Sequence, residues 1–254
     1  MIPLDDRGLL LGDGLFETML ALDGAIPAIE AHLDRLAAGC AVLGLPDLDR
    51  GAARALCLAA PPAAGRAAVR LTLTAGSGGR GLDRPIEIEP RFRVTVALSA
   101  PIETPATLIV AQTRRNEGSP ASRLKTLAYL DNVLARAEAR VAGADEAVML
   151  NNAGHIACAA AANLFWIEGD RLLTPALDCG VLAGITRARV LAAARSWEIE
   201  ALVIAADGAR LAGADGIFLT NSLIGVRPVS RLHERIFAPH PLTERLRAVF
   251  SSLA

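Results

Sequence analysis

The order of strand-like and helix-like segments restricts the fold of this chain more than any other feature. A pair of strands is predicted around the turn signal Asp23-Gly24, and the closing segment 242–253 has helical spacing. Between them the periodicity predicts helices at 31–45, 48–60, 129–142 and 184–197, and strands at 67–75, 92–100, 106–115 and 163–175. It also predicts a hairpin over 146–160 and a strand that leads into a loop over 216–232. Because strands and helices do not alternate as a regular βαβα repeat, we expect an α+β fold.

A Gly-, Ser- and Pro-rich segment, "NEGSPAS", interrupts the pattern near the middle of the chain. Such a composition is typical of a connection between domains. We therefore predict an N-terminal lobe over 1–113, a linker over 114–121 and a C-terminal lobe over 122–254.

Composition excludes several classes of function. The net charge is -1 with no basic run, which argues against a nucleic-acid partner or an anionic membrane surface. No apolar run approaches the ~20 residues of a membrane span, and the first residues lack a secretory signal. The four cysteines form no C-x-x-C pair and no metal-like spacing with histidine, so we expect a reduced, cytoplasmic location and no metal.

The segment "GSGGRG", Gly76–Gly81, matches the spacing of a dinucleotide-binding loop. That function needs a helix to begin at the last glycine, whereas Pro85 and alternating residues follow here. We therefore interpret the segment as a Gly-rich hairpin loop. Arg80 within it is a candidate for binding a carboxylate, since the neighbouring glycines allow a close approach.

Three segments are candidates for binding an anion. Gly184 leads into a predicted helix whose first residues, Ile185 and Thr186, offer unpaired N–H groups suited to a phosphate. The alternative is an ordinary helix N-cap at Thr186. The other candidates are the small polar residues of "LTNSLIG", which include Asn221 and Ser222, and the helical cation Arg35, which on its own is as consistent with a solvated surface residue.

Lys125 is the one lysine of the chain: of 26 basic residues, the other 25 are arginines. Arginine replaces lysine as a surface cation, but its guanidinium stays protonated and is no amine nucleophile. The retained lysine therefore indicates imine chemistry, unless it survives by chance. The one tyrosine, Tyr129, follows four residues later.

Seven segments together resemble the fold-type IV pyridoxal-phosphate enzymes, the class IV aminotransferase family, and most of all its aminodeoxychorismate lyases. They occur in the family's order from Asp6 to Val229: "DRGLLLGDGLFETM", "HLDRL", "LTLTAGSGGRGL", "SRLKTLAYLDNVLARAEA", "AAANLFWIEGDRLLTP", "GVLAGITRARVL" and "FLTNSLIGVRPV".

The resemblance implies a two-lobe fold like that of D-amino acid aminotransferase, with pyridoxal 5'-phosphate between the lobes, in a homodimer whose active sites borrow residues across the interface. It implies that Lys125 forms the internal aldimine and then moves the substrate's α-proton. It implies that Tyr129 lies near the cofactor. The phosphate would be held by Arg35, the N–H groups of Ile185 and Thr186, and the Asn221–Ser222 turn.

The chain departs from the family at three positions. Five residues before Asn163 the family has a glutamate that keeps the pyridine nitrogen protonated, and here Cys158 stands in its place. A thiol removes the charge that holds that proton, which suits an elimination better than a full transamination. An acid from elsewhere, water, or a repurposed enzyme are the alternatives. Leu11 and Ala75 replace residues on segments that face the substrate in the family.

We therefore expect a lyase that releases pyruvate and 4-aminobenzoate from the external aldimine of 4-amino-4-deoxychorismate, an intermediate of folate biosynthesis. The first alternative is an aminotransferase acting on a D-amino acid or a branched-chain amino acid with a 2-oxo acid. The second is a non-catalytic binding protein on the same scaffold.

Overall fold

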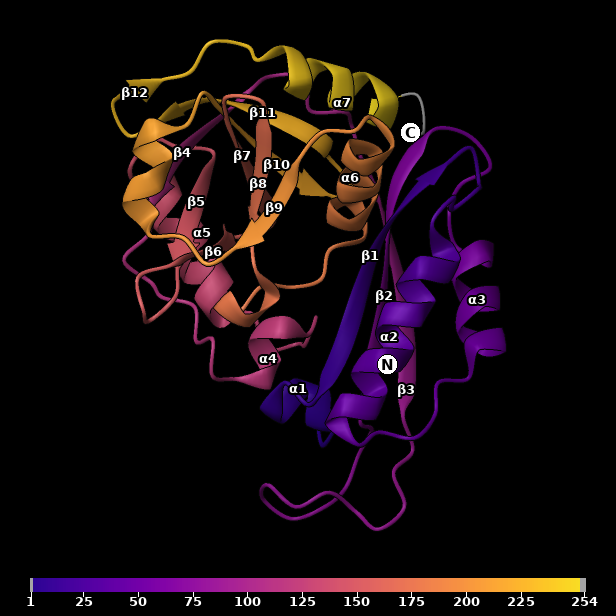
Figure 1. Ribbon diagram of the computed structural model, residues 1–254. Helices are drawn as coiled ribbons and strands as arrows, with labels where there is room; N and C mark the ends of the chain where they lie inside the picture. Colours follow the sequence, from indigo (N-terminus) through magenta and orange to yellow (C-terminus); the bar gives the residue numbers. More distant parts are fainter. Residues whose placement is uncertain (1, 252–254) are drawn as a thin grey trace. The chain divides into compact units, whose positions relative to one another are not determined.

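The computed structural model describes residues 2–251, and its contacts divide this part of the chain into two compact units (Figure 1). Unit 1 runs to Ala100 and includes Leu124–Ala128; unit 2 consists of Pro101–Arg123 and the chain from Tyr129 onward. These divisions differ from the boundaries expected at 113 and 121. Strand pairing explains the difference, because the residues around Lys125 pair with a strand of unit 1, whereas the strand that begins at Ala106 pairs within unit 2.

Unit 1 is an antiparallel sheet of three strands in the order β1-β2-β3, with helices packed on one face. Its strands are β1 (Gly14–Leu22), β2 (Arg66–Thr74) and β3 (Arg91–Leu98), and its helices are α1 (Arg7–Leu11), α2 (Ile29–Leu43) and α3 (Arg50–Ala59). Alternate residues of β1 and β2 point into the core, where Met19, Leu33 and Leu71 are fully buried. The apolar residues that alternate along the strands and those on one face of α2 thus pack together in one apolar layer.

The turn at Asp23-Gly24 forms as expected, since both residues have positive φ. No second strand follows it. Ala25 makes only a single bridge to Leu22, and α2 begins four residues later at Ile29.

The segment around Lys125 pairs with the beginning of β1 through backbone hydrogen bonds. The Phe16 amide donates to the Lys125 carbonyl at 2.8 Å, and the Leu127 amide donates to the Gly14 carbonyl at 3.0 Å. A Cβ at position 14 would lie 2.2 Å from the Leu73 carbonyl, so only glycine allows this packing.

Unit 2 is built on a nine-stranded sheet, of which eight strands lie in the order β6-β5-β4-β11-β10-β7-β8-β9, and β12 pairs with β11. The strands are β4 (Ala106–Val110), β5 (Glu146–Leu150), β6 (Ile156–Ala159), β7 (Asn163–Glu168), β8 (Arg171–Pro175), β9 (Ala201–Ile204), β10 (Gly216–Asn221), β11 (Gly225–Leu232) and β12 (Arg235–Ile236). The helices are α4 (Pro120–Arg123), α5 (Leu130–Val141), α6 (Ile185–Ser196) and α7 (Pro241–Ser251), with 3₁₀ turns η1 (Leu177–Cys179) and η2 (Gly208–Gly213).

The sheet of unit 2 has apolar clusters on both faces. One cluster includes Leu108, Trp166 and Leu219. On the other side, α5 packs on β5, while α6 and α7 pack on β10 and the strands beside it (Figure 1). β4 pairs in parallel with both β5 and β11, and its pairing with β11 brings together segments that are more than 100 residues apart.

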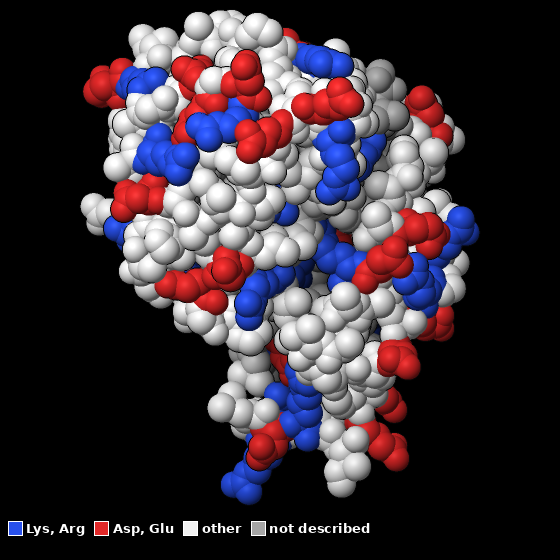
Figure 2. All heavy atoms as spheres, viewed as in Figure 1, with Lys and Arg blue, Asp and Glu red and all other residues white. Residues whose placement is uncertain are grey.

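Residues 163–175, expected as one strand, form the β7–β8 hairpin, and 216–232 form β10 and β11. The predicted closing helix is α7, and its expected last two residues lie outside the described part of the chain. Within that part, no helix is both long and apolar enough to cross a bilayer. Figure 2 shows acidic and basic side chains interspersed on the face in view.

Candidate active site

The Lys125 side chain lies against an aromatic ring of β1. Its Nζ is 4.1 Å from the centroid of the Phe16 ring, and the Cζ of Arg70 is 3.7 Å from the same centroid. Lys125 is half-buried, and its backbone is fixed by the hydrogen bonds to β1. The one lysine of the chain thus lies in a turn hydrogen-bonded to β1, next to a second cation, Arg70, that spacing along the chain did not single out.

Arg35 of α2 is bound to a buried carboxylate of β1. Its Nε donates to Oε1 of Glu17 at 2.8 Å and its Nη2 donates to Oε2 at 2.6 Å, while His32 Nδ1 lies 2.7 Å from Oε2. Burial acts to raise the pKa of Glu17, but the bonds and charges of Arg35 and His32 outweigh it and lower that pKa. Arg35 is therefore held firmly rather than solvated.

The first turn of α6 offers backbone donors for an anion. Its N-cap, Gly184, has no side chain to satisfy the first N–H groups, and Thr186 is buried. A Cβ on Gly184 would lie 1.8 Å from Oδ1 of Asn163, whose amide in turn donates to the Leu182 carbonyl at 2.9 Å. Asn163 and Gly184 therefore shape the loop before the helix together. The N-cap residue is Gly184, so the alternative of an ordinary N-cap at Thr186 does not hold.

Arg187 adds buried positive charge to the same turn. Its Nε donates to the Thr174 hydroxyl at 3.3 Å and its Nη2 to the Pro175 carbonyl at 3.0 Å. No carboxylate contacts it in the described residues, and burial lowers the pKa of its guanidinium. A helix N-terminus with an adjacent uncompensated cation fits a phosphate group.

The Asn221 side chain shapes the turn after β10. Its Oδ1 accepts from the amides of Leu223 and Ile224, each at 2.9 Å, and its Nδ2 donates to the Ala161 carbonyl at 2.9 Å. Ala161 lies two residues before Asn163, so the two polar turns of unit 2 are joined. Asn221 thus organises the turn, and Ser222 at its second position is half-buried.

Cys158 lies on β6 with its thiol buried. Burial raises the thiol pKa; the charge of Arg115 opposes that shift and the charge of Glu146 adds to it. The residue opposite on β5 is Met149, so the thiol lies in an apolar cluster with two charged groups nearby. Cys158 is therefore a neutral thiol at neutral pH.

The two charged groups near Cys158 were not found from the sequence. Arg115 is buried and donates to the carbonyls of Gly180 and Ser122 and to Oδ1 of Asn132. Glu146 accepts from Arg136 Nη1 at 2.6 Å, and burial raises the pKa of Glu146. Neither residue belongs to a recognisable motif, because their closeness to Cys158 depends on strand pairing rather than on spacing along the chain.

The remaining predicted residues lie at the edges of elements. Tyr129 is the N-cap residue of α5 and is half-buried, Leu11 is the last residue of α1 and is exposed, and Arg80 lies in an exposed loop after β2. Unit 1 therefore contains Lys125, Arg35, Arg80 and Leu11, whereas unit 2 contains Tyr129, Cys158, Asn163, Ile185, Thr186, Asn221 and Ser222.

Comparison with known proteins gives one consistent result. The chain is 30% identical to aminodeoxychorismate lyase of Vibrio harveyi, over 90% of this chain and 86% of that protein. It is 28% identical to a putative branched-chain-amino-acid aminotransferase of Methanocaldococcus jannaschii, over 99% of this chain and 91% of that protein.

Among solved structures, 4-amino-4-deoxychorismate lyase from Pseudomonas aeruginosa is 33% identical, with a TM-score of 0.87 over 99% of this chain and 95% of that chain. Residues 14–232 match the family model described as amino-transferase class IV. The chain thus belongs to the class IV aminotransferase family, which confirms the expected fold, its being an enzyme, and its pyridoxal phosphate cofactor.

Proposed function

We propose that this enzyme is a lyase that cleaves 4-amino-4-deoxychorismate into 4-aminobenzoate and pyruvate. The observation that carries the proposal is the neutral, buried thiol of Cys158 at the position where the family has an acid. The similarity to lyases over nine-tenths of the chain supports the same reaction.

When bound, pyridoxal phosphate supplies a carbonyl that condenses with amines and a ring that withdraws electrons from the carbon next to the nitrogen. Lys125 supplies the amine to which that carbonyl is joined. With the substrate's amine in its place, Lys125 Nζ would take the proton from the carbon that bears the amino group. Loss of that proton, with departure of the enolpyruvyl oxygen from the neighbouring carbon, would make the substrate's ring aromatic without an oxidant. The departing enolpyruvate would take up a proton and become pyruvate.

Phosphate binding is assigned to the first turn of α6, the Asn221–Ser222 turn and Arg35. The N–H groups of Ile185 and Thr186 are donors that no side-chain cap occupies, and Arg187 in the same helical turn adds charge. Glu17 holds Arg35 through Nε and Nη2, and the positive charge of this fixed guanidinium is assigned to the phosphate. Tyr129 is assigned to the neighbourhood of the cofactor ring.

Cys158 favours elimination for an electrostatic reason. A carboxylate at this position keeps a proton on the ring nitrogen and lets the ring store the electron pair that transamination requires. A thiol whose pKa is raised by burial carries no charge at neutral pH, so this position offers no such support. In an elimination the electron pair leaves with pyruvate instead.

An aminotransferase is the second candidate, and one observation favours it. Glu146 is a buried carboxylate close enough to affect the Cys158 thiol, and in this candidate it takes the place of the missing acid. The similarity to a branched-chain-amino-acid aminotransferase over 99% of the chain is in line with this candidate. Burial of Glu146 argues the other way, because it raises the pKa of that carboxyl and so favours its neutral form.

The proposal includes a cytoplasmic homodimer. The four cysteines are buried and free, in keeping with a reducing compartment. Several apolar side chains on the outer face of α5 are exposed, including Leu130 at 67% and Val141 at 91%, which suits burial against a second copy.

The test is a product assay with purified protein loaded with the cofactor. We expect 4-aminobenzoate and pyruvate in equal amounts from 4-amino-4-deoxychorismate, without a 2-oxo acid acceptor. Amino transfer from a D-amino acid or a branched-chain amino acid, with no 4-aminobenzoate formed, would replace the lyase by the aminotransferase.

A further inference from the structure

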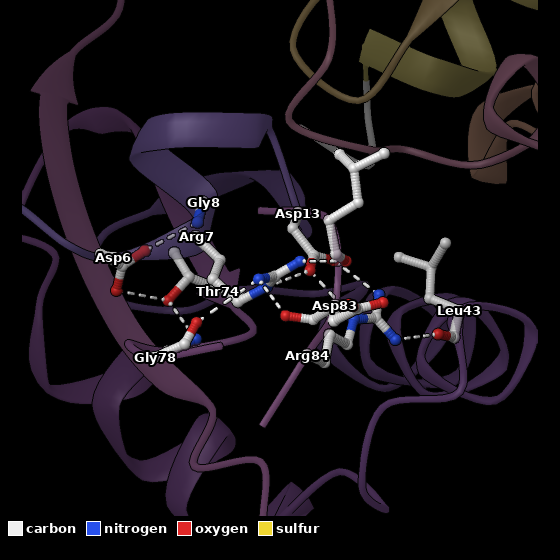
Figure 3. Close-up of polar contacts among 11 residues, drawn as sticks. Asp6, Arg7, Gly8, Asp13, Leu43, Thr74, Gly78, Asp83 and Arg84 are labelled. Carbon is white, nitrogen blue, oxygen red and sulfur yellow. Dashed lines mark hydrogen bonds and ion pairs between the residues drawn. The ribbon is translucent and has the colours of Figure 1, made fainter. Parts of the chain in front are cut away.

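The loop Gly76–Arg84, which we call the arm, is held by hydrogen bonds from Arg7 of α1. Arg7 Nη1 donates to the Asp83 carbonyl at 2.9 Å and to the Gly78 carbonyl at 3.4 Å, and its Nη2 donates to the Leu82 carbonyl at 2.9 Å (Figure 3). Arg7 is 4% exposed. A buried guanidinium that donates hydrogen bonds to three carbonyls of one loop fixes the conformation of that loop.

Arg7 is itself held by a shared carboxylate. Asp13 accepts from Arg7 Nε at 2.9 Å through Oδ2, and from Arg84 through both oxygens (Figure 3). Arg84 also donates to the Leu43 carbonyl at the end of α2. Hydrogen bonding from Arg84, supported by Arg7, lowers the pKa of Asp13. We call Arg7, Asp13 and Arg84 the clamp.

The base of the arm is anchored separately. The Arg7 amide donates to the Gly76 carbonyl at 2.8 Å, and the buried Asp6 accepts from the Thr74 hydroxyl at 2.9 Å. A Cβ on Gly79 would lie 2.0 Å from the Asp83 carbonyl, where φ is also positive, so the arm closes on itself in a form that requires glycine.

Arg80 is the arginine that the arm exposes to solvent. Its backbone pairs with Asp83 at the tip of the arm, and its side chain is exposed. Within the described residues its guanidinium makes no hydrogen bond or ion pair. The clamp therefore fixes the backbone around an arginine that is left available to a ligand.

We propose that the clamp positions Arg80 to bind a carboxylate of the substrate, and that Arg7, Asp13 and Arg84 are positioning residues of the enzyme. The inference rests on the proposed function, since it takes a carboxylate-bearing amino substrate as the ligand. The physical reason is preorganisation. A free loop of this length loses conformational entropy when its arginine binds, whereas a clamped loop has already lost it on folding.

The test combines proteolysis with kinetics. Trypsin cuts after Arg80 but not at Arg84, which precedes Pro85, so a fragment that begins at Gly81 reports opening of the arm. We expect Asp13→Asn and Arg84→Gln to release this fragment roughly tenfold faster than the unaltered enzyme does. Arg93→Gln, an exposed arginine on β3 outside the clamp, is the matched control and should leave the rate unchanged.

In kinetics, both clamp variants should raise KM about tenfold with kcat little changed, and Arg80→Ala should raise KM at least as much. Faster cleavage with an unchanged KM, or an unchanged KM for Arg80→Ala, would overturn the inference, as would clamp variants cut at the unaltered rate. KM is measured with whichever amino substrate the unaltered enzyme consumes. A transaminating enzyme would therefore refute the lyase and still test the clamp.

Discussion

Arg35 of α2 donates two parallel hydrogen bonds to Glu17 of β1, at 2.8 and 2.6 Å, with His32 on the same carboxylate. Glu17 is 1% exposed, so these bonds join a helix to the sheet of unit 1 at a carboxylate that is shielded from solvent. The arrangement holds Arg35, the residue proposed to bind phosphate, in one orientation.

Replacing Glu17 by Gln should destabilise unit 1, because the partly buried Arg35 then lacks its counter-charge. We expect a loss of about 3 kcal/mol in the free energy of unfolding, measured by urea denaturation. Glu30→Gln is the control: Glu30 pairs with Arg50 and Arg54 on the surface and should cost less than about 1 kcal/mol. Equal effects of the two changes would contradict this account.

The same carboxylate predicts an acid dependence. The pKa of Glu17 is lower in the folded protein than the ordinary glutamate value of 4.5. Its contribution to stability is therefore complete above that value and is lost as the pH falls through the folded pKa. Unfolding free energies measured from about pH 7 down to about pH 3 should fall less steeply for Glu17→Gln than for the unaltered protein. Parallel curves would count against the role given to Glu17.

Replacing Lys125 by Arg should keep the positive charge beside Phe16 and abolish the chemistry. Activity should drop on the order of a thousandfold or more, because a guanidinium neither joins the cofactor nor accepts a proton. The unaltered protein should be yellow, and borohydride should fix the cofactor to residue 125, as mass spectrometry of its peptides can check. Covalent fixation at another residue would refute the assignment.

Replacing Cys158 by Glu should increase half-transamination. The new carboxylate would support a proton on the ring nitrogen, so the cofactor absorbance should change faster on mixing with a D- or L-amino acid, by about tenfold. Cys158→Ser, which introduces no charge, is the matched control and should resemble the unaltered enzyme. No gain for the glutamate variant would remove the electrostatic argument for elimination.

Replacing Gly184 by Ala should weaken cofactor binding, since a Cβ there meets Oδ1 of Asn163 at 1.8 Å. The loop before α6 must then move, and we expect the Kd for pyridoxal phosphate to rise about tenfold in a fluorescence titration. Gly213→Ala serves as the control, because a Cβ at that position meets nothing within 4 Å. If both variants bind the cofactor equally well, the anion site lies elsewhere.

Much of the local structure follows from periodicity and turn residues. Helices α2, α3, α5 and α6 begin and end within about two residues of their predicted bounds, because apolar spacing and capping are local properties. The hairpin of β7 and β8 was missed as two strands, although Gly169 and Asp170 between two apolar runs are a local turn signal. Division of the chain at residues 101, 124 and 129 was missed for a different reason: it depends on which distant strands pair.

The sequence by itself determined the kind of chemistry. The chain has one lysine, Lys125, and so one lysine amine that can act as a nucleophile. The motifs before and after it occur in the same order as in the class IV aminotransferases. The tertiary structure alone decided the electrostatics: that Glu17 binds Arg35, that Arg115 and Glu146 act on Cys158, and that Arg7 closes the arm. The physical reason is that the energy of a charge depends on its burial and on partners brought from distant segments, which spacing along a chain does not encode.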